Sequence, residues 1–153
     1  PTLARMNSPL PPPKEFYGTS VGHALGGFQL LEEGLKSYIG LHYTTVRALV
    51  AGRVHFDFQR ADIQEAALGR LLTIFAKLCS NRPFVEEIRR LVKHRDHAAH
   101  QAFARLYGIN TSDSEFVKMA EENLKLATQL ATIQGQLHAE MKSLLAVLEQ
   151  QGD

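Results

Sequence analysis

Apolar residues recur along this chain at the spacing of α-helices, and no stretch shows the strict alternation of a β-strand. Between about residues 20 and 50, helical steps of three and four separate a stripe made of Val21, Leu25, Phe28, Leu35, Ile39, Val46 and Leu49. This stripe predicts a long first helix. Gly27 and Gly34 lie on its opposite side, where each is unfavourable by about 1 kcal/mol relative to alanine, so we expect another helix to approach closely there.

Three more helices follow by the same criterion. The second is expected over about residues 61–79, where Asn81, Arg82 and Pro83 end it. The third begins near Pro83 and continues to about residue 107, before Gly108. Residues 110–114 supply N-cap candidates for a fourth helix that extends to about residue 150. At 1.5 Å per residue it would be about 50 Å long, so we expect it to bend or to pack its far end on a partner chain.

These elements predict an all-α fold, a four-helix up-down bundle. Its residues are 16–153, preceded by a flexible Pro-rich arm over residues 1–15 that contains Pro9 and residues 11–13. Met6 is a candidate natural start of the chain. The chain therefore reads as one domain with a short arm.

Composition narrows the class of protein without naming a function. The 153 residues are 44% hydrophobic and 22% charged, which is ordinary for one globular domain. A single cysteine, Cys79, fits a reducing compartment, and no apolar run reaches the roughly eighteen residues of a membrane span. We expect a cytoplasmic protein with no membrane contact. Because the net charge is only +1, any binding of nucleic acid must depend on a basic surface confined to one part of the protein.

The third helix carries a charge in its apolar face. A helical projection groups Phe84, Ile88, Leu91, Val92, Ala98, Ala99, Ala102, Phe103 and Leu106, with Arg95 near the centre of the group. A buried guanidinium needs a partner or a wet cleft. Glu32 occupies the equivalent place in the stripe of the first helix, so we predict that Glu32 and Arg95 lie close together. Such a pair can be purely structural, fixing helix register.

Basic and histidine side chains surround Arg95. The main basic concentration of the chain lies within residues 82–95, where Arg82, Arg89, Arg90, Lys93 and Arg95 are set against Glu86 and Glu87. It is either a solvated helix face or an RNA-binding surface, for which Arg89, Arg90, Lys93 and His94 are the candidate residues. His97, His100 and Asp96 follow within two turns. A histidine at the border of an apolar face can titrate near neutrality and exchange protons with a substrate.

Residues 91–100, Leu-Val-Lys-His-Arg-Asp-His-Ala-Ala-His, resemble the signature of the HEPN superfamily. In that signature an Arg is followed by a polar residue, and four to six residues separate the Arg from a His. Here four residues lie between Arg95 and His100. Residues 28–36, with Glu32 embedded, are similar to the opening helix of that family. The resemblance spans about residues 18–107. Asp96 stands where asparagine is frequent, and Ala102 stands where some subfamilies have tyrosine.

The resemblance implies a homodimer with two motifs facing one cleft, and metal-independent RNA cleavage without a cofactor, as in toxin or defence systems. In this implied chemistry His100 moves the proton of the attacking 2′-hydroxyl and Arg95 stabilises the developing phosphorane. Asp96 orients either residue, with Glu32 and His97 in support. An ideal helix separates Arg95 from His100 by about 140°, which a dimer cleft or a helix irregularity would have to overcome.

Two alternatives remain. His94, His97 and His100 repeat an i, i+3 spacing that could hold a metal ion, although no Glu-x-x-His or Cys pair accompanies them. The other alternative is a non-catalytic helical dimer that acts as a protein-protein interaction or regulatory module. In that case the Glu32–Arg95 pair is structural.

Overall fold

The computed structural model describes residues 11–108 and 110–150, and every regular element in this part of the chain is helical. The four α-helices are α1 (Pro13–Val50), α2 (Leu68–Leu78), α3 (Arg82–Tyr107) and α4 (Asp113–Glu149), and a short 3-10 turn, η1 (Arg60–Ile63), precedes α2. The predicted all-α class with four helices is confirmed. None of these helices combines the length and the apolar character that crossing a membrane requires.

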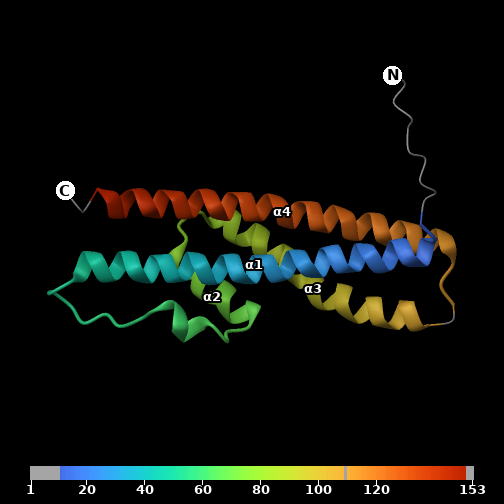
Figure 1. Ribbon diagram of the computed structural model, residues 1–153, viewed down its shortest axis with the longest axis horizontal. Coiled ribbons are helices and arrows are strands. Elements are labelled where there is room, and N and C mark those ends of the chain that lie inside the picture. Colours follow the sequence, from blue (N-terminus) through green and yellow to red (C-terminus); the bar gives the residue numbers. More distant parts are fainter. Residues whose placement is uncertain (1–10, 109, 151–153) are drawn as a thin grey trace, which may run out of the picture.

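Helices α1 and α4 lie side by side along most of their length and run in the same direction (Figure 1). Their register is constant: Asn123 Nδ2 donates to Ser20 Oγ at 3.2 Å, and Leu130 packs on Gly27 seven residues further on. The parallel direction departs from the expected up-down order, in which these two helices would be antiparallel. The seven-residue spacing of the contacts is that of a coiled-coil seam.

Gly27 and Gly34 explain how closely the two helices approach, as their position in the sequence predicted. A Cβ atom at Gly27 would lie 2.9 Å from Leu130 Cδ1, and one at Gly34 would lie 2.8 Å from Leu137 Cδ2. Both leucines are fully buried. The neighbouring helix is therefore α4 of the same chain.

The length of α4 has the same explanation. With 37 residues it nearly matches the 38 of α1, and the two cover each other. Packing against α1 therefore explains the length of α4. Neither of the expected explanations, a bend or a contact with a partner chain, is required.

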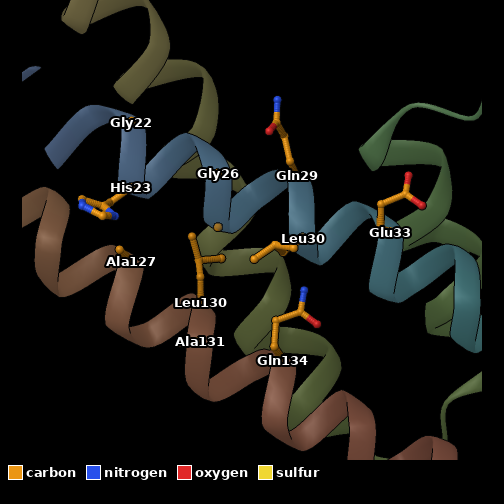
Figure 2. Close-up of a pocket in the computed structure, with 11 residues that line it drawn as sticks. Gly22, His23, Gly26, Gln29, Leu30, Glu33, Ala127, Leu130, Ala131 and Gln134 are labelled. Carbon is orange, nitrogen blue, oxygen red and sulfur yellow. The ribbon is translucent and has the colours of Figure 1, made fainter. Parts of the chain in front are cut away.

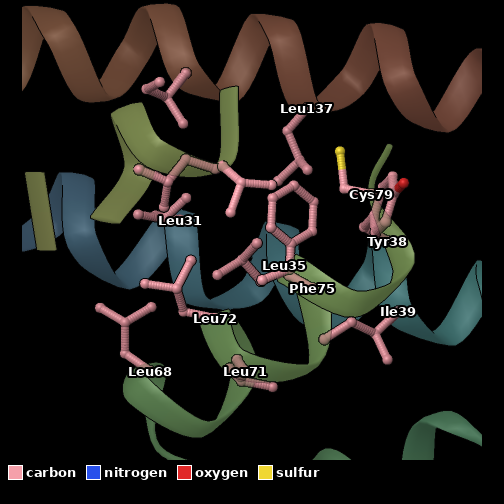
Figure 3. Packing of buried hydrophobic residues seen from close by; sticks show 14 of the residues in the cluster. Leu31, Leu35, Tyr38, Ile39, Leu68, Leu71, Leu72, Phe75, Cys79 and Leu137 are labelled. Carbon is pink, nitrogen blue, oxygen red and sulfur yellow. The ribbon is translucent and has the colours of Figure 1, made fainter. Parts of the chain in front are cut away.

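The main core lies where α2 and the first half of α3 pack against the α1–α4 pair. Figure 3 shows Leu35 and Tyr38 of α1 meeting Phe75 of α2 and Leu137 of α4. The rings of Tyr38 and Phe75 are 4.9 Å apart, edge to face. Cys79 is buried in this cluster, in agreement with its predicted place on an apolar face.

Helix α3 leaves the core halfway along its length. Phe84, Val85, Ile88 and Leu91 of its first half are buried, whereas Ala102 is the only buried residue after them among the described positions of α3. Ala99 and Phe103, which were predicted to be core residues, are exposed. The reason is that α1 and α4 pack directly on each other here, with the rings of Tyr17 and Phe116 at 5.5 Å.

Two boundaries also differ from the predicted ones. The first helix already begins at Pro13, whose place in the first turn suits proline, so the predicted arm over residues 1–15 is too long. Its residues 1–10 lie outside the described part. The second helix begins at Leu68 rather than near residue 61, because Asp62 accepts from the backbone N–H of Gln59 and closes η1 as a separate turn.

Candidate functional site

The predicted catalytic residues Arg95, Asp96 and His100 all lie on α3, which is helical without a break. Arg95 is half-buried, and Asp96 and His100 are exposed, so solvent reaches all three. Regular helix geometry keeps Arg95 and His100 about 140° apart around the axis. One copy of the chain therefore does not direct both side chains at the same phosphate.

The predicted contact between Glu32 and Arg95 is wrong. The carboxylate of Glu32 accepts a hydrogen bond from Lys36 Nζ at 3.2 Å. Within residues 11–108 and 110–150, Arg95 forms neither an ion pair nor a side-chain hydrogen bond with any residue. Lys36 takes the carboxylate because it lies one turn further along α1 and is itself buried.

Lys36 is the charge that the packed helices do bury. Its ammonium also lies 3.0 Å from Glu33 Oε1. The hydrogen bond to Glu33 raises the pKa of Lys36, opposed by desolvation and aided by the second bond, to Glu32. Arg95 needs no such partner because the second half of α3 leaves it partly in water.

The surface between Arg95 and His100 is uncovered, and Asp96 is the charged residue among otherwise apolar side chains. The surface consists of Ala99, Phe103 and Tyr107 together with Asp96, and Phe103 and Tyr107 are 71% and 77% exposed. Their ring centroids are 5.0 Å apart. We call this surface, with Arg95 and His100 at its two borders, the exposed α3 face. Two large aromatic rings so open to water are typical of an interaction surface.

The predicted RNA-binding residues remain on the outside of α3. Arg89, Arg90, Lys93 and His94 are all exposed. Arg89 forms an ion pair with Glu86 one turn earlier on the helix. Arg90 and Lys93 form no ion pair with any described residue, so their charges are available to a phosphate backbone.

A second feature of α3 is a groove that it forms with α4. The groove has a volume of about 360 Å³, and its α3 wall contains His94, His97 and Gln101. Tyr17 closes it from α1; burial raises the pKa of this phenol, with Arg105 acting in the opposite direction, so the hydroxyl stays protonated at neutral pH. This α3–α4 groove brings the two predicted histidines together but contains neither Arg95 nor His100.

The histidines do not assemble a metal centre. Across the described ranges, no three side chains of His, Cys, Asp or Glu are grouped as metal ligands. His94 and His97 line the α3–α4 groove, whereas His100 points from another side of the helix and does not line it. The alternative of a three-histidine metal site therefore has no such cluster to support it.

A larger and more apolar groove runs between α1 and α4, with about 530 Å³ of space (Figure 2). Small residues form much of its walls, and Leu30 stands in it with 64% of its surface exposed. A Cβ atom added at Gly22 or Gly26 would meet nothing within 4 Å. Unlike Gly27, these two glycines have no packing reason within the chain. We call this surface the α1–α4 groove.

Reasoning from the sequence missed the groove residues of α4. Glu122, Lys125 and Gln129 follow one another at helical spacing, as do His94, His97 and Gln101 on α3. Each stripe was visible in the sequence. Their meeting was not, because it depends on how α3 crosses α4.

Comparison of the chain with protein-family models, with curated proteins and with solved structures finds no match.

Proposed function

We propose that this chain is a HEPN-like RNA-binding protein and metal-independent endoribonuclease that acts as a homodimer through the exposed α3 face. The observation that carries the proposal is the exposure of Phe103, with Tyr107 beside it, between Arg95 and His100. An apolar surface bordered by these two side chains is what a composite catalytic cleft needs. As part of the same proposal we place the protein in the cytoplasm and, by its resemblance to the HEPN superfamily, in a toxin or defence system.

The homodimer removes the geometric obstacle within one helix. When the exposed α3 faces of two copies pack about a two-fold axis that runs along α3, each face is buried against its equivalent. Arg95 of one copy then approaches His100 of the other, although the two are about 140° apart on one helix. Arg89, Arg90 and Lys93 lie nearer the start of α3 and extend the basic surface toward the cleft.

The chemistry is transesterification within the RNA. The ribose 2′-oxygen forms a bond to the adjacent phosphorus as His100 accepts its proton, and the bond to the 5′-oxygen breaks as that oxygen takes up a proton. The products are a 2′,3′-cyclic phosphate and a 5′-hydroxyl. Arg95 donates hydrogen bonds to the phosphorane oxygens. Asp96 lies on the same exposed α3 face, between Arg95 and His100.

A non-catalytic helical dimer is the second candidate, and the α1–α4 groove favours it. Leu30 protrudes next to the open hollow over Gly22 and Gly26, so two antiparallel copies can exchange leucines as knobs into holes. The same arrangement brings Glu33 within a helical turn of the partner's His23. No residue of α3 lines this groove, so a dimer formed here leaves the two α3 faces apart.

Two matched substitutions separate the candidates. Phe103→Glu and Leu30→Glu each put a charge into one of the two surfaces, and neither residue is in the core. Sedimentation equilibrium should show a wild-type dimer that Phe103→Glu converts to monomer and Leu30→Glu leaves intact. The opposite pattern supports the non-catalytic dimer.

Cleavage of single-stranded RNA tests the catalytic part. We expect Arg95→Ala to lower the rate by about 10²–10³-fold and His100→Ala by about 10²–10⁴-fold, with chelators having no effect. Arg105→Ala, on the same helix, is the control and should retain activity. Equal rates for all variants, each shown to be folded by circular dichroism, would contradict the endoribonuclease proposal.

A further inference from the structure

The α3–α4 groove gathers polar side chains that the fold itself does not use. These side chains come from both walls: His94, His97 and Gln101 of α3, and Glu122, Asn123, Lys125 and Gln129 of α4. Within the described chain, Asn123 alone among them forms a side-chain hydrogen bond, donating to Ser20 Oγ at 3.2 Å. The other six have no side-chain partner among the described residues, so their hydrogen-bonding groups are open to a ligand.

The groove also has the size and the apolar lining of a ligand site. Its volume of about 360 Å³ falls in the usual range of roughly 300–1,000 Å³ for small-molecule sites. Ala98, Met119 and Leu126 line it between the polar residues. Ser20 Oγ, which donates to the carbonyl of Tyr17 at 2.7 Å, anchors Asn123 at one end. One part of the groove is thus held in place by a buried and a partly buried hydrogen bond.

The residue types match the two halves of a nucleotide. Lys125 and the imidazoles of His94 and His97 can donate to phosphate oxygens. The carboxamides of Gln101 and Gln129 each offer a donor and an acceptor, the pattern that reads the edge of a base. The apolar side chains that line the groove between them can pack against the flat face of the nucleobase. Inorganic phosphate alone would leave the carboxamides unused.

The groove also lies on the path of the basic side chains. His94 follows Arg90 by one turn of α3 and is next to Lys93, so phosphates held by these residues continue into the groove. Arg95 and His100 do not line it. A nucleotide bound here would therefore lie on another side of α3 from Arg95 and His100 and would not be one of the reacting groups.

We propose that the α3–α4 groove is a specificity subsite that binds one unstacked nucleotide of a single-stranded RNA. This inference rests on the proposed RNA-binding function, because it assigns a place to a nucleotide of that substrate. Lys125 and the two histidines hold the phosphate, and the carboxamides of Gln101 and Gln129 read the base. Glu122, on the same wall as Lys125, disfavours a second phosphate and accepts from an amino group of the base.

Titration of the full chain with AMP, CMP, GMP and UMP tests the subsite without requiring cleavage. Nuclear magnetic resonance should show shifts of the side-chain amides of Gln101, Asn123 and Gln129 with at least one nucleotide. Lys125→Ala should lower the affinity for that nucleotide by about tenfold, the loss expected for a hydrogen bond to a charged group. Gln129→Ala should reduce the discrimination between the four bases.

Matched controls come from the same helix. Lys118→Ala and Gln136→Ala remove exposed side chains of α4 that do not line the groove, and both should bind nucleotides like the wild type. If inorganic phosphate binds as tightly as every nucleotide, or if none of the four shifts the groove amides, the nucleotide subsite is wrong. RNA cleavage that survives such a result would leave the proposed function standing. Nucleotide binding in a chain that cleaves no RNA would support the subsite and contradict the proposed endoribonuclease activity.

Discussion

Among single residues, the two charges that the sequence placed in apolar stripes have different fates. Glu32 is held by Lys36, which is 5% exposed and also contacts Glu33. Arg95 stays half-buried without an ion pair to any described residue. Lys36 lies one turn after Glu32, so the local i, i+4 rule offered this partner. The nearer partner on the same helix therefore takes the carboxylate that the sequence pattern assigned to Arg95.

The adjacent glycines of α1 give a stability prediction at this scale. Gly26→Ala should raise the free energy of unfolding by up to about 1 kcal/mol, because the new methyl group meets no atom and favours the helix. Gly27→Ala should instead lower it by about 1–3 kcal/mol, since Leu130 Cβ lies only 3.2 Å from the added atom and is fixed to its own helix. Urea unfolding of both variants measures the difference. Equal effects would contradict the close contact of α1 with α4.

Among the helices, α3 shows which buried residues a periodic sequence pattern predicts correctly and which it does not. The projection correctly selected Phe84, Ile88 and Leu91 as buried residues. It also selected Ala99 and Phe103, which the structure leaves exposed. Periodicity identifies the face of a helix that can be buried. Whether something covers that face depends on the position of the other helices.

The start of α4 yields a prediction of pH dependence. Ser112 caps the helix: its backbone N–H donates to Glu115 Oε2 at 2.9 Å and its hydroxyl to the same oxygen at 2.8 Å. These bonds hold the pKa of Glu115 below its ordinary value of 4.5. The unfolded chain therefore takes up the proton first as the pH falls. The stabilisation is complete above pH 4.5 and disappears as the pH falls through the lowered pKa.

Ser112→Ala should accordingly lower the free energy of unfolding by about 1 kcal/mol at neutral pH. The difference from the wild type should shrink as the pH falls below 4.5 and through the lowered pKa of Glu115. Urea denaturation at neutral pH and over a series of acidic buffers measures it. Ser114→Ala, which leaves the Ser112–Glu115 bonds in place, is the control. A difference that does not change with pH would show that the Glu115 carboxylate takes no part in the cap.

In the whole molecule, the parallel α1–α4 pair organises everything else. The first half of α3 and α2 cover one side of the pair near its middle, and the second half of α3 lies against the end at which α1 and α4 begin (Figure 1). This end has the smaller apolar cluster, so the second half of α3 has less packing to hold it. Local stability should differ accordingly along one continuous helix.

Amide hydrogen exchange should reveal this difference. In the monomeric Phe103→Glu variant, amides of residues 28–39 and 130–137 should exchange slowest, and residues 96–107 of α3 faster than residues 84–92. The wild-type dimer should slow exchange in residues 96–107, because the proposed interface covers them. Uniform protection of α3 in the monomer would contradict the division of this helix.

The sequence by itself determined the helices, the core of the first half of α3, the close approach at Gly27 and Gly34, and which residues carry candidate chemistry. These follow from local rules, since periodicity, glycine and caps act within a few turns. Only the tertiary structure decided that α4 runs parallel to α1, that Arg95 does not meet Glu32, and that His94 and His97 face Lys125 across a groove. Those outcomes depend on the relative direction and crossing of whole helices, which residue spacing along one helix does not specify.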